Sequence, residues 1–162
     1  AGFEDVNGDG LPEVVSWSDA PADTLFEACT GCPRRLIERI YTERKDEGFA
    51  LNDSRLVPAP YSMFVLFIRL LVDHNHPAAA RLLYRPAQLD EAIGWGWGTR
   101  RAPGTWKLEM TENESWPRWL QFRFRGVRGV ERYVVRFTQK DGRWLIENWK
   151  RTASPATGTS RK

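Results

Sequence analysis

The sequence has 162 residues, of which 41% are hydrophobic and 28% are charged, so it can form one ordinary domain, or one small domain with an added segment. The formal net charge is only +3 and the basic and acidic residues are interspersed, which argues against a nucleic-acid-binding stripe despite a pI near 9.1. The longest apolar run, residues 63–72, is too short to span a membrane.

Residues 1–57 carry the signals of a small antiparallel β unit, in which a Gly- and Asp-rich turn precedes runs of alternating or β-branched residues. The predicted strands span residues 13–17, 36–43 and 49–51. A Gly-marked turn separates the last two strands, which favours a hairpin. A helix that begins near Pro33 is the alternative for residues 36–41, because proline suits the first turn of a helix.

Residues 59–98 carry helical signals. Ser62 is a candidate N-cap for the first helix, which is apolar nearly all round and is therefore expected to be deeply buried. After a polar break, Pro77 begins a second helix. The predicted helices span residues 63–72, 78–84 and 89–93. An aromatic loop rich in glycine follows at residues 94–98.

Residues 105–151 have the pattern of an antiparallel meander. The predicted strands span residues 106–110, 119–125, 132–137 and 144–149. Asp141 and Gly142 lie between the last two strands, and this dipeptide is a strong hairpin signal.

Helices followed by a meander predict an α+β fold. We expect a calcium-loop β-hairpin or blade-like segment at residues 1–57, and two to three helices packed on a curved four-stranded antiparallel sheet at residues 58–152. The small, polar residues at 153–162 predict a flexible tail.

Residues 5–13 have the spacing of a calcium-binding loop. Side-chain oxygens occupy loop positions one, three, five and nine, a backbone carbonyl would serve at position seven, and Gly10 permits the sharp turn at position six. The predicted ligands are Asp5, Asn7, Asp9, the Leu11 carbonyl and Glu13. Calcium takes roughly six to eight oxygen ligands, which this spacing can begin to supply. The alternative is a tight Asx-rich turn without a metal.

With Phe3 before it, and Tyr41, Gly48 and Phe49 after it, the segment at residues 5–15 resembles one FG-GAP/VCBS repeat. The resemblance implies a calcium-bearing hairpin of a β-propeller blade, typical of exported or cell-surface proteins. One copy cannot close a propeller, which needs roughly four to eight blades. We therefore expect the chain to be part of a larger protein, or the hairpin to pack on the C-terminal domain or pair with another subunit. The expected partner is another protein or a second copy, bound through the N-terminal hairpin.

Residues 60–151 resemble the nuclear-transport-factor-2-like (cystatin-like, SnoaL-like) superfamily in the order of their helices, aromatic loop and meander. Members of that superfamily enclose a cone-shaped pocket and serve as enzymes, ligand binders or assembly modules, so the fold alone does not fix a function. The candidate pocket residues are Trp95, Trp97, Trp106, Trp119 and Tyr133. The alternative is that these rings fill the core.

A ketosteroid-isomerase-like site would need a carboxylate base and a tyrosine donor that face the pocket. The candidates are Asp90, Glu109, Tyr133 and Glu147, and nothing in the sequence places them together. We therefore expect a non-catalytic calcium-binding module that acts in structural assembly or in ligand or protein interaction. A small-molecule binder or SnoaL-like enzyme with an aromatic pocket is the alternative.

Cys29 and Cys32 form a CxxC pair, and their even number favours a local disulfide. A disulfide and the exported character of the calcium repeat both predict an extracytoplasmic location: secreted, periplasmic or at the cell surface. Thiol redox chemistry is the alternative, although the βαβ units of a thioredoxin-like fold are missing. His74 and His76 are candidates for a metal site, but Asn75 or His76 capping the next helix is the simpler interpretation of this segment.

Overall fold

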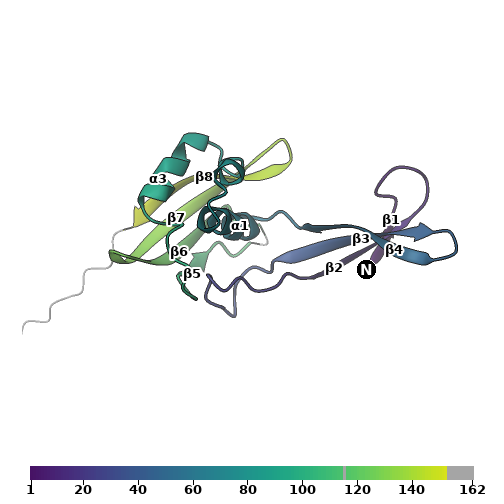
Figure 1. The fold of residues 1–162 in the computed structure, drawn as a ribbon, viewed down its shortest axis with the longest axis horizontal. Coiled ribbons are helices and arrows are strands. Elements are labelled where there is room, and N and C mark those ends of the chain that lie inside the picture. Colours follow the sequence, from purple (N-terminus) through teal and green to yellow (C-terminus); the bar gives the residue numbers. More distant parts are fainter. Residues whose placement is uncertain (115, 153–162) are drawn as a thin grey trace, which may run out of the picture.

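The structure, a computed structural model, describes residues 1–114 and 116–152, so the predicted tail at 153–162 lies outside the described residues. Within them, two four-stranded antiparallel sheets and three α-helices confirm the α+β class. The first sheet extends away from a body that the helices and the second sheet form together (Figure 1).

The first sheet, here called the projecting sheet, has the strand order β1-β2-β3-β4. Its strands are β1 (Gly2–Glu4), β2 (Glu13–Asp19), β3 (Leu36–Arg44) and β4 (Gly48–Leu56). The predicted hairpin at residues 36–51 is confirmed, and its helical alternative is wrong. Asp46 and Gly48 have positive φ angles of 73° and 74° in its turn, which glycine and aspartate tolerate best.

The first helix is α1 (Pro60–Val72), and Ala59 is its N-cap residue. The expectation that Ser62 caps this helix is therefore wrong, since Ser62 lies within the first turn and is only 1% exposed. Pro60 explains the difference, because its fixed φ angle and missing N–H group suit the first position of a helix.

The other two helices are α2 (His76–Ala80) and α3 (Leu89–Gly94), with a short 3-10 helix (Pro86–Gln88) between them. Asn75 caps α2 by accepting a hydrogen bond from the Ala78 amide, as the simpler interpretation of this segment has it. The helix predicted at 78–84 ends early, because Leu83 forms an isolated bridge to Ile146 of the second sheet.

The second sheet has the order β5-β6-β7-β8, a meander. Its strands are β5 (Trp106–Thr111), β6 (Trp119–Gly126), β7 (Gly129–Lys140) and β8 (Arg143–Thr152). The predicted Asp-Gly hairpin joins β7 to β8, and both of its central residues have positive φ angles, 51° at Asp141 and 73° at Gly142. Two positive φ angles match the twist of adjacent strands, which is why this dipeptide is so predictive.

The core lies between the helices and the second sheet and is rich in aromatic residues. The glycines of the aromatic loop position Trp97 there. Gly96 has a φ angle of 78°, and a Cβ atom on Gly98 would lie 2.8 Å from the carbonyl oxygen of Leu71 in α1. Because the loop backbone can approach α1 so closely, the Trp97 ring is completely buried.

Leu25 and Phe26, from the loop between β2 and β3, also belong to the core of the body. The carbonyl of Leu25 accepts a hydrogen bond from the Trp106 amide at 2.9 Å, so this loop adds backbone pairing to the β5 edge. Asp23 accepts hydrogen bonds from the guanidinium group of Arg69 in α1 at 2.6 and 3.1 Å. The loop between β2 and β3 therefore attaches the projecting sheet to the body.

Candidate functional site

The predicted calcium loop connects β1 to β2 at the end of the projecting sheet far from the body (Figure 1). Three alternate side chains accept hydrogen bonds from backbone amides further along the loop. Asp5 accepts from the amides of Gly8 and Gly10 at 2.8 and 3.0 Å. Asn7 and Asp9 each accept from the amide two residues later, at 2.8 Å. All three side chains therefore turn back over their own loop.

Glu13, the first residue of β2, closes the loop. It is only 3% exposed, and its carboxylate accepts hydrogen bonds from the Val6 amide at 2.7 Å and from the side-chain amide of Asn7 at 2.8 Å. Both donors are neutral, so they satisfy the oxygens without balancing the charge. A buried carboxylate is ordinarily paired with a cation, because burial disfavours an uncompensated charge.

The loop fits calcium in the kind of donor it offers, since every predicted ligand is a hard oxygen. It does not gather those donors around one point. Within residues 1–114 and 116–152, no group of three or more His, Cys, Asp or Glu side chains could hold a metal ion. Binding would therefore require the carboxylates of Asp5, Asp9 and Glu13 to draw closer together.

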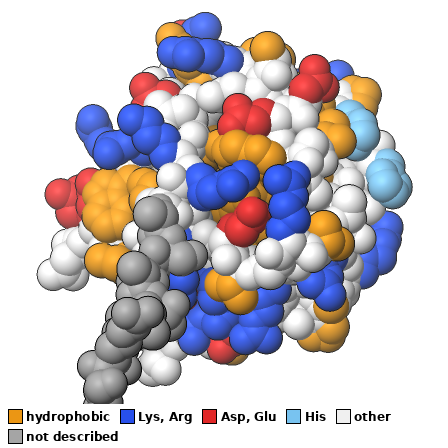
Figure 2. Space-filling model, turned by 90° about the vertical axis from the view of Figure 1, so that its left-hand side faces the viewer, with side chains coloured by type: hydrophobic (Ala, Val, Ile, Leu, Met, Phe, Trp, Pro, Cys, Tyr) orange, Lys and Arg blue, Asp and Glu red, His pale blue; other side chains and the backbone are white. Residues whose placement is uncertain are grey.

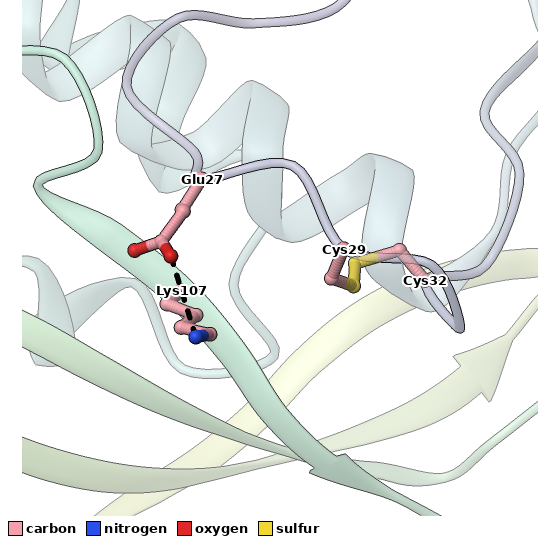
Figure 3. Close-up of a disulfide and its surroundings, with 4 residues drawn as sticks. All are labelled: Glu27, Cys29, Cys32 and Lys107. Atoms are coloured by element: carbon pink, nitrogen blue, oxygen red, sulfur yellow. Dashed lines mark ion pairs between the residues drawn. A yellow bond between two sulfur atoms is a disulfide. The ribbon is translucent and has the colours of Figure 1, made fainter.

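Cys29 and Cys32 lie at disulfide distance, with their Cα atoms 5.4 Å apart, as the sequence predicts (Figure 3). Nearby, Glu27 forms ion pairs with Arg123 at 2.7 Å and with Lys107 at 3.3 Å. The hydrogen bond from Arg123, and to a lesser extent the one from Lys107, lowers the pKa of the Glu27 carboxyl. Glu27 and the cystine lie in the loop between β2 and β3, whereas Lys107 and Arg123 lie on β5 and β6, so these ion pairs also attach the loop to the body.

Three of the five predicted pocket residues, Trp97, Trp106 and Tyr133, are completely buried in the core. Trp95 is partly buried and stacks on Tyr133, with ring centroids 5.1 Å apart. Trp119 is half-buried on β6. The rings of the aromatic loop thus pack against core side chains, which agrees with the alternative that these rings fill the core.

Two of the four candidate catalytic residues are engaged with other partners. The Tyr133 hydroxyl donates to Glu131 at 2.6 Å, and its burial, together with this hydrogen bond, raises the pKa of Tyr133 to about 12. Glu109 pairs with Arg132 at 2.8 Å. The remaining candidates, Asp90 and Glu147, lie on α3 and β8. Tyr133 and Glu109 are therefore held by Glu131 and Arg132 rather than by each other.

Sequence reasoning missed a groove at the junction of the projecting sheet and the body. Two cavities of about 560 and 540 Å³ share two residues of the β5–β6 loop, Glu114 and Trp116. The first cavity also contacts Leu36 and Val57, near the body end of the projecting sheet, and the second contacts Trp144 of β8. Only the presence of a tryptophan in a polar loop could have signalled it, because the groove forms between segments far apart in the sequence.

Comparisons with known protein families, with curated proteins and with solved structures found no match for this chain. The two family resemblances therefore stay predictions. Among the described helices, none has the length and apolar character needed to cross a membrane.

Proposed function

We propose that this chain is a non-catalytic, extracytoplasmic module that binds one calcium ion in the loop at residues 5–13 and contacts another protein through its projecting sheet. The ion would link the start of β2 to the loop before it, so that the far end of the sheet becomes stiffer. Its donors would be Asp5, Asn7, Asp9, the Leu11 carbonyl and Glu13.

The observation that carries the calcium proposal is the buried Glu13 carboxylate with two neutral hydrogen-bond donors. A divalent cation beside it would supply the charge balance that these donors lack. The inward turn of Asp5, Asn7 and Asp9 supports the same site, since a carboxylate or amide oxygen that accepts one hydrogen bond keeps a second lone pair. The cystine supports an extracytoplasmic location, because disulfides persist mainly in oxidising compartments.

Calorimetric titration with calcium tests the site directly. We expect one ion to bind per chain with a dissociation constant below about 1 mM, and Asp5→Asn to weaken binding by about tenfold or more, because ligand charge sets the affinity of such loops. Asp141→Asn is the matched control: this exposed aspartate lies in the β7–β8 turn, and asparagine tolerates its positive φ angle. Wild-type protein that releases no heat with millimolar calcium, and shows no change in melting temperature with calcium or chelator, would end the proposal.

One face of the projecting sheet presents an apolar row that crosses all four strands. Phe3 lies opposite Val14, Val14 opposite Tyr41, and Tyr41 opposite Leu51. Residues directly opposite one another in an antiparallel sheet share a face. Phe3 is 71% exposed, Leu51 is 50% exposed, and the Phe3 ring also contacts Phe49. Contiguous exposed apolar side chains favour a protein partner.

The charge distribution favours a second copy of this chain as that partner. In residues 1–57, acidic side chains outnumber basic ones two to one, whereas basic side chains predominate in residues 58–152. Figure 2 faces the end of the body away from the projecting sheet, where many Lys and Arg side chains are exposed. The acidic projecting sheet of one copy is thus complementary to the basic body of another.

Sedimentation velocity over a range of protein concentrations tests self-association. We expect wild-type protein to associate reversibly, and Leu51→Ser to weaken the association by about tenfold, since it removes an apolar contact from the row. Val127→Ser is the control, because Val127 is 83% exposed in the body outside the row. A wild-type chain that stays monomeric at every concentration, with calcium present, would exclude association through this surface.

A further inference from the structure

The groove at the junction has features that neither calcium binding nor self-association uses. It lies at the body end of the projecting sheet, whereas the calcium loop lies at the opposite end (Figure 1). Its two cavities, of about 560 and 540 Å³, meet at Trp116 and Glu114. Each is within the size range of small-molecule sites. Because the cavities share these two residues, one elongated ligand could occupy both.

Trp116 forms an aromatic platform between the two cavities. Its side chain is 48% exposed, and its ring is nearly parallel to that of Trp144, with an interplanar angle of 11° and centroids 6.4 Å apart. Exposed indole rings supply a large, flat apolar surface at little cost in conformational entropy. The partner of such a ring needs a flat face of polarised C–H groups or a second aromatic ring.

Polar side chains lie around this platform. Asn113 and Glu114 line the first cavity, and Gln139 lines the second, and all three are exposed. Their planar amide and carboxylate groups can each meet two neighbouring hydroxyl groups of a ligand at once. An apolar platform between planar hydrogen-bonding groups is complementary to a pyranose ring, which has an apolar C–H face and hydroxyl groups at its edge.

The charges lining the groove balance, which favours a neutral ligand. Glu112 and Glu114 supply two negative charges, and Arg34 and Arg118 supply two positive charges. Arg34 pairs with Asp19 at 2.8 Å, and Glu112 accepts a hydrogen bond from the Arg118 amide at 2.9 Å. Two of the four charged side chains, Arg34 and Glu112, therefore have partners of their own, and the balanced charges create no strong field of one sign.

We propose that this groove binds a neutral oligosaccharide, with a sugar ring stacked on Trp116 and with Asn113, Glu114 and Gln139 hydrogen-bonded to its hydroxyl groups. The two cavities that meet at Trp116 each receive part of the same sugar chain. The proposal is independent of the calcium site and of self-association, so its failure would leave both intact.

Calorimetric titration of the full chain with cellohexaose, maltohexaose, chitohexaose and mannohexaose tests this. We expect at least one of them to bind, and Trp116→Ala to weaken that binding by about tenfold or more. Loss of an aromatic side chain stacked on a nucleic-acid base has an effect of this size. Trp116→Phe should retain part of the affinity, because it keeps a smaller ring. The matched control is Trp17→Ala, since Trp17 is a similarly exposed tryptophan, 44% exposed, on β2.

Circular dichroism of each variant will show whether the fold is retained, which we expect because Trp116 is at the surface. Binding to none of the four hexasaccharides would overturn the proposal, as would a Trp116→Ala variant with wild-type affinity. Tighter binding of a decaproline peptide, or of an acidic polygalacturonate fragment, would assign the groove to another class of ligand and overturn it equally.

Discussion

The projecting sheet and the second sheet are both four-stranded and antiparallel, but their side chains are buried to very different degrees. In β6, Leu120, Phe122 and Phe124 are buried against the core at alternate positions. In β4, none of the nine residues is buried. A sheet gains independent stability mainly when one face packs against other elements. Similar hydrogen-bonded ladders can therefore have different sources of stability, and local opening should concentrate in the projecting sheet.

Replacing a tryptophan by alanine should destabilise the body far more than the projecting sheet. Trp97→Ala should lower the free energy of unfolding by about 3–5 kcal/mol, because it leaves a cavity in the aromatic core of the body. Trp17→Ala should lower it by less than about 1 kcal/mol, since the Trp17 ring is partly exposed and loses one hydrogen bond, to Glu38. Urea denaturation measures both values. Equal losses would show that the two sheets do not differ as proposed.

The second prediction concerns the body at alkaline pH. Burial and the Glu131 hydrogen bond raise the pKa of Tyr133 to about 12, above its ordinary value near 10, so the folded state holds this proton more tightly than the unfolded state. The resulting stability is fully present below about pH 10 and is lost as pH rises toward 12. The loss amounts to on the order of 2–3 kcal/mol.

Urea denaturation of wild type and Tyr133→Phe between pH 9 and 11.5 measures this loss, because phenylalanine has no proton to release there. The stability difference between wild type and the variant should shrink as pH rises. A constant difference across this range would show that Tyr133 does not link the stability of the body to pH.

The third prediction concerns the segment that joins the two regions. Replacing Cys29 and Cys32 together by serine should cost about 1–2 kcal/mol, because the disulfide closes a very short loop and restricts the unfolded chain only slightly. Thermal denaturation of the double variant, with wild type as reference, measures the effect. A variant that no longer folds would show that the cystine holds the projecting sheet on the body far more strongly than this account allows.

Features set by neighbouring residues could be predicted from the sequence. The tight turn between β7 and β8 requires two positive φ angles, which Asp141 and Gly142 tolerate. Asn75 directly precedes the helix that it caps. The β-branched and aromatic residues of β3 and the turn after it gave the hairpin. In each case the determining contacts lie within a few residues along the chain.

Features set by distant contacts could not be predicted. The sequence offers no signal that Leu25 and Phe26 leave the first segment to enter the core of the body, since the partners that bury them come from α1 and β5. Eight tryptophans were visible, but which rings fill the core and which stay exposed depends on packing. Hence the burial of Trp97 and the exposure of Trp116 at the groove emerged only from the structure.

Amide hydrogen exchange with and without calcium shows whether the ion binds the loop at residues 5–13, because exchange reports on each segment separately. We predict that calcium slows exchange of the loop amides that donate hydrogen bonds to Asp5, Asn7 and Asp9, and of the amides of β2 beside them. Exchange in the second sheet should stay unchanged. Identical exchange at residues 5–19 in millimolar calcium and in chelator would show that calcium does not bind this loop.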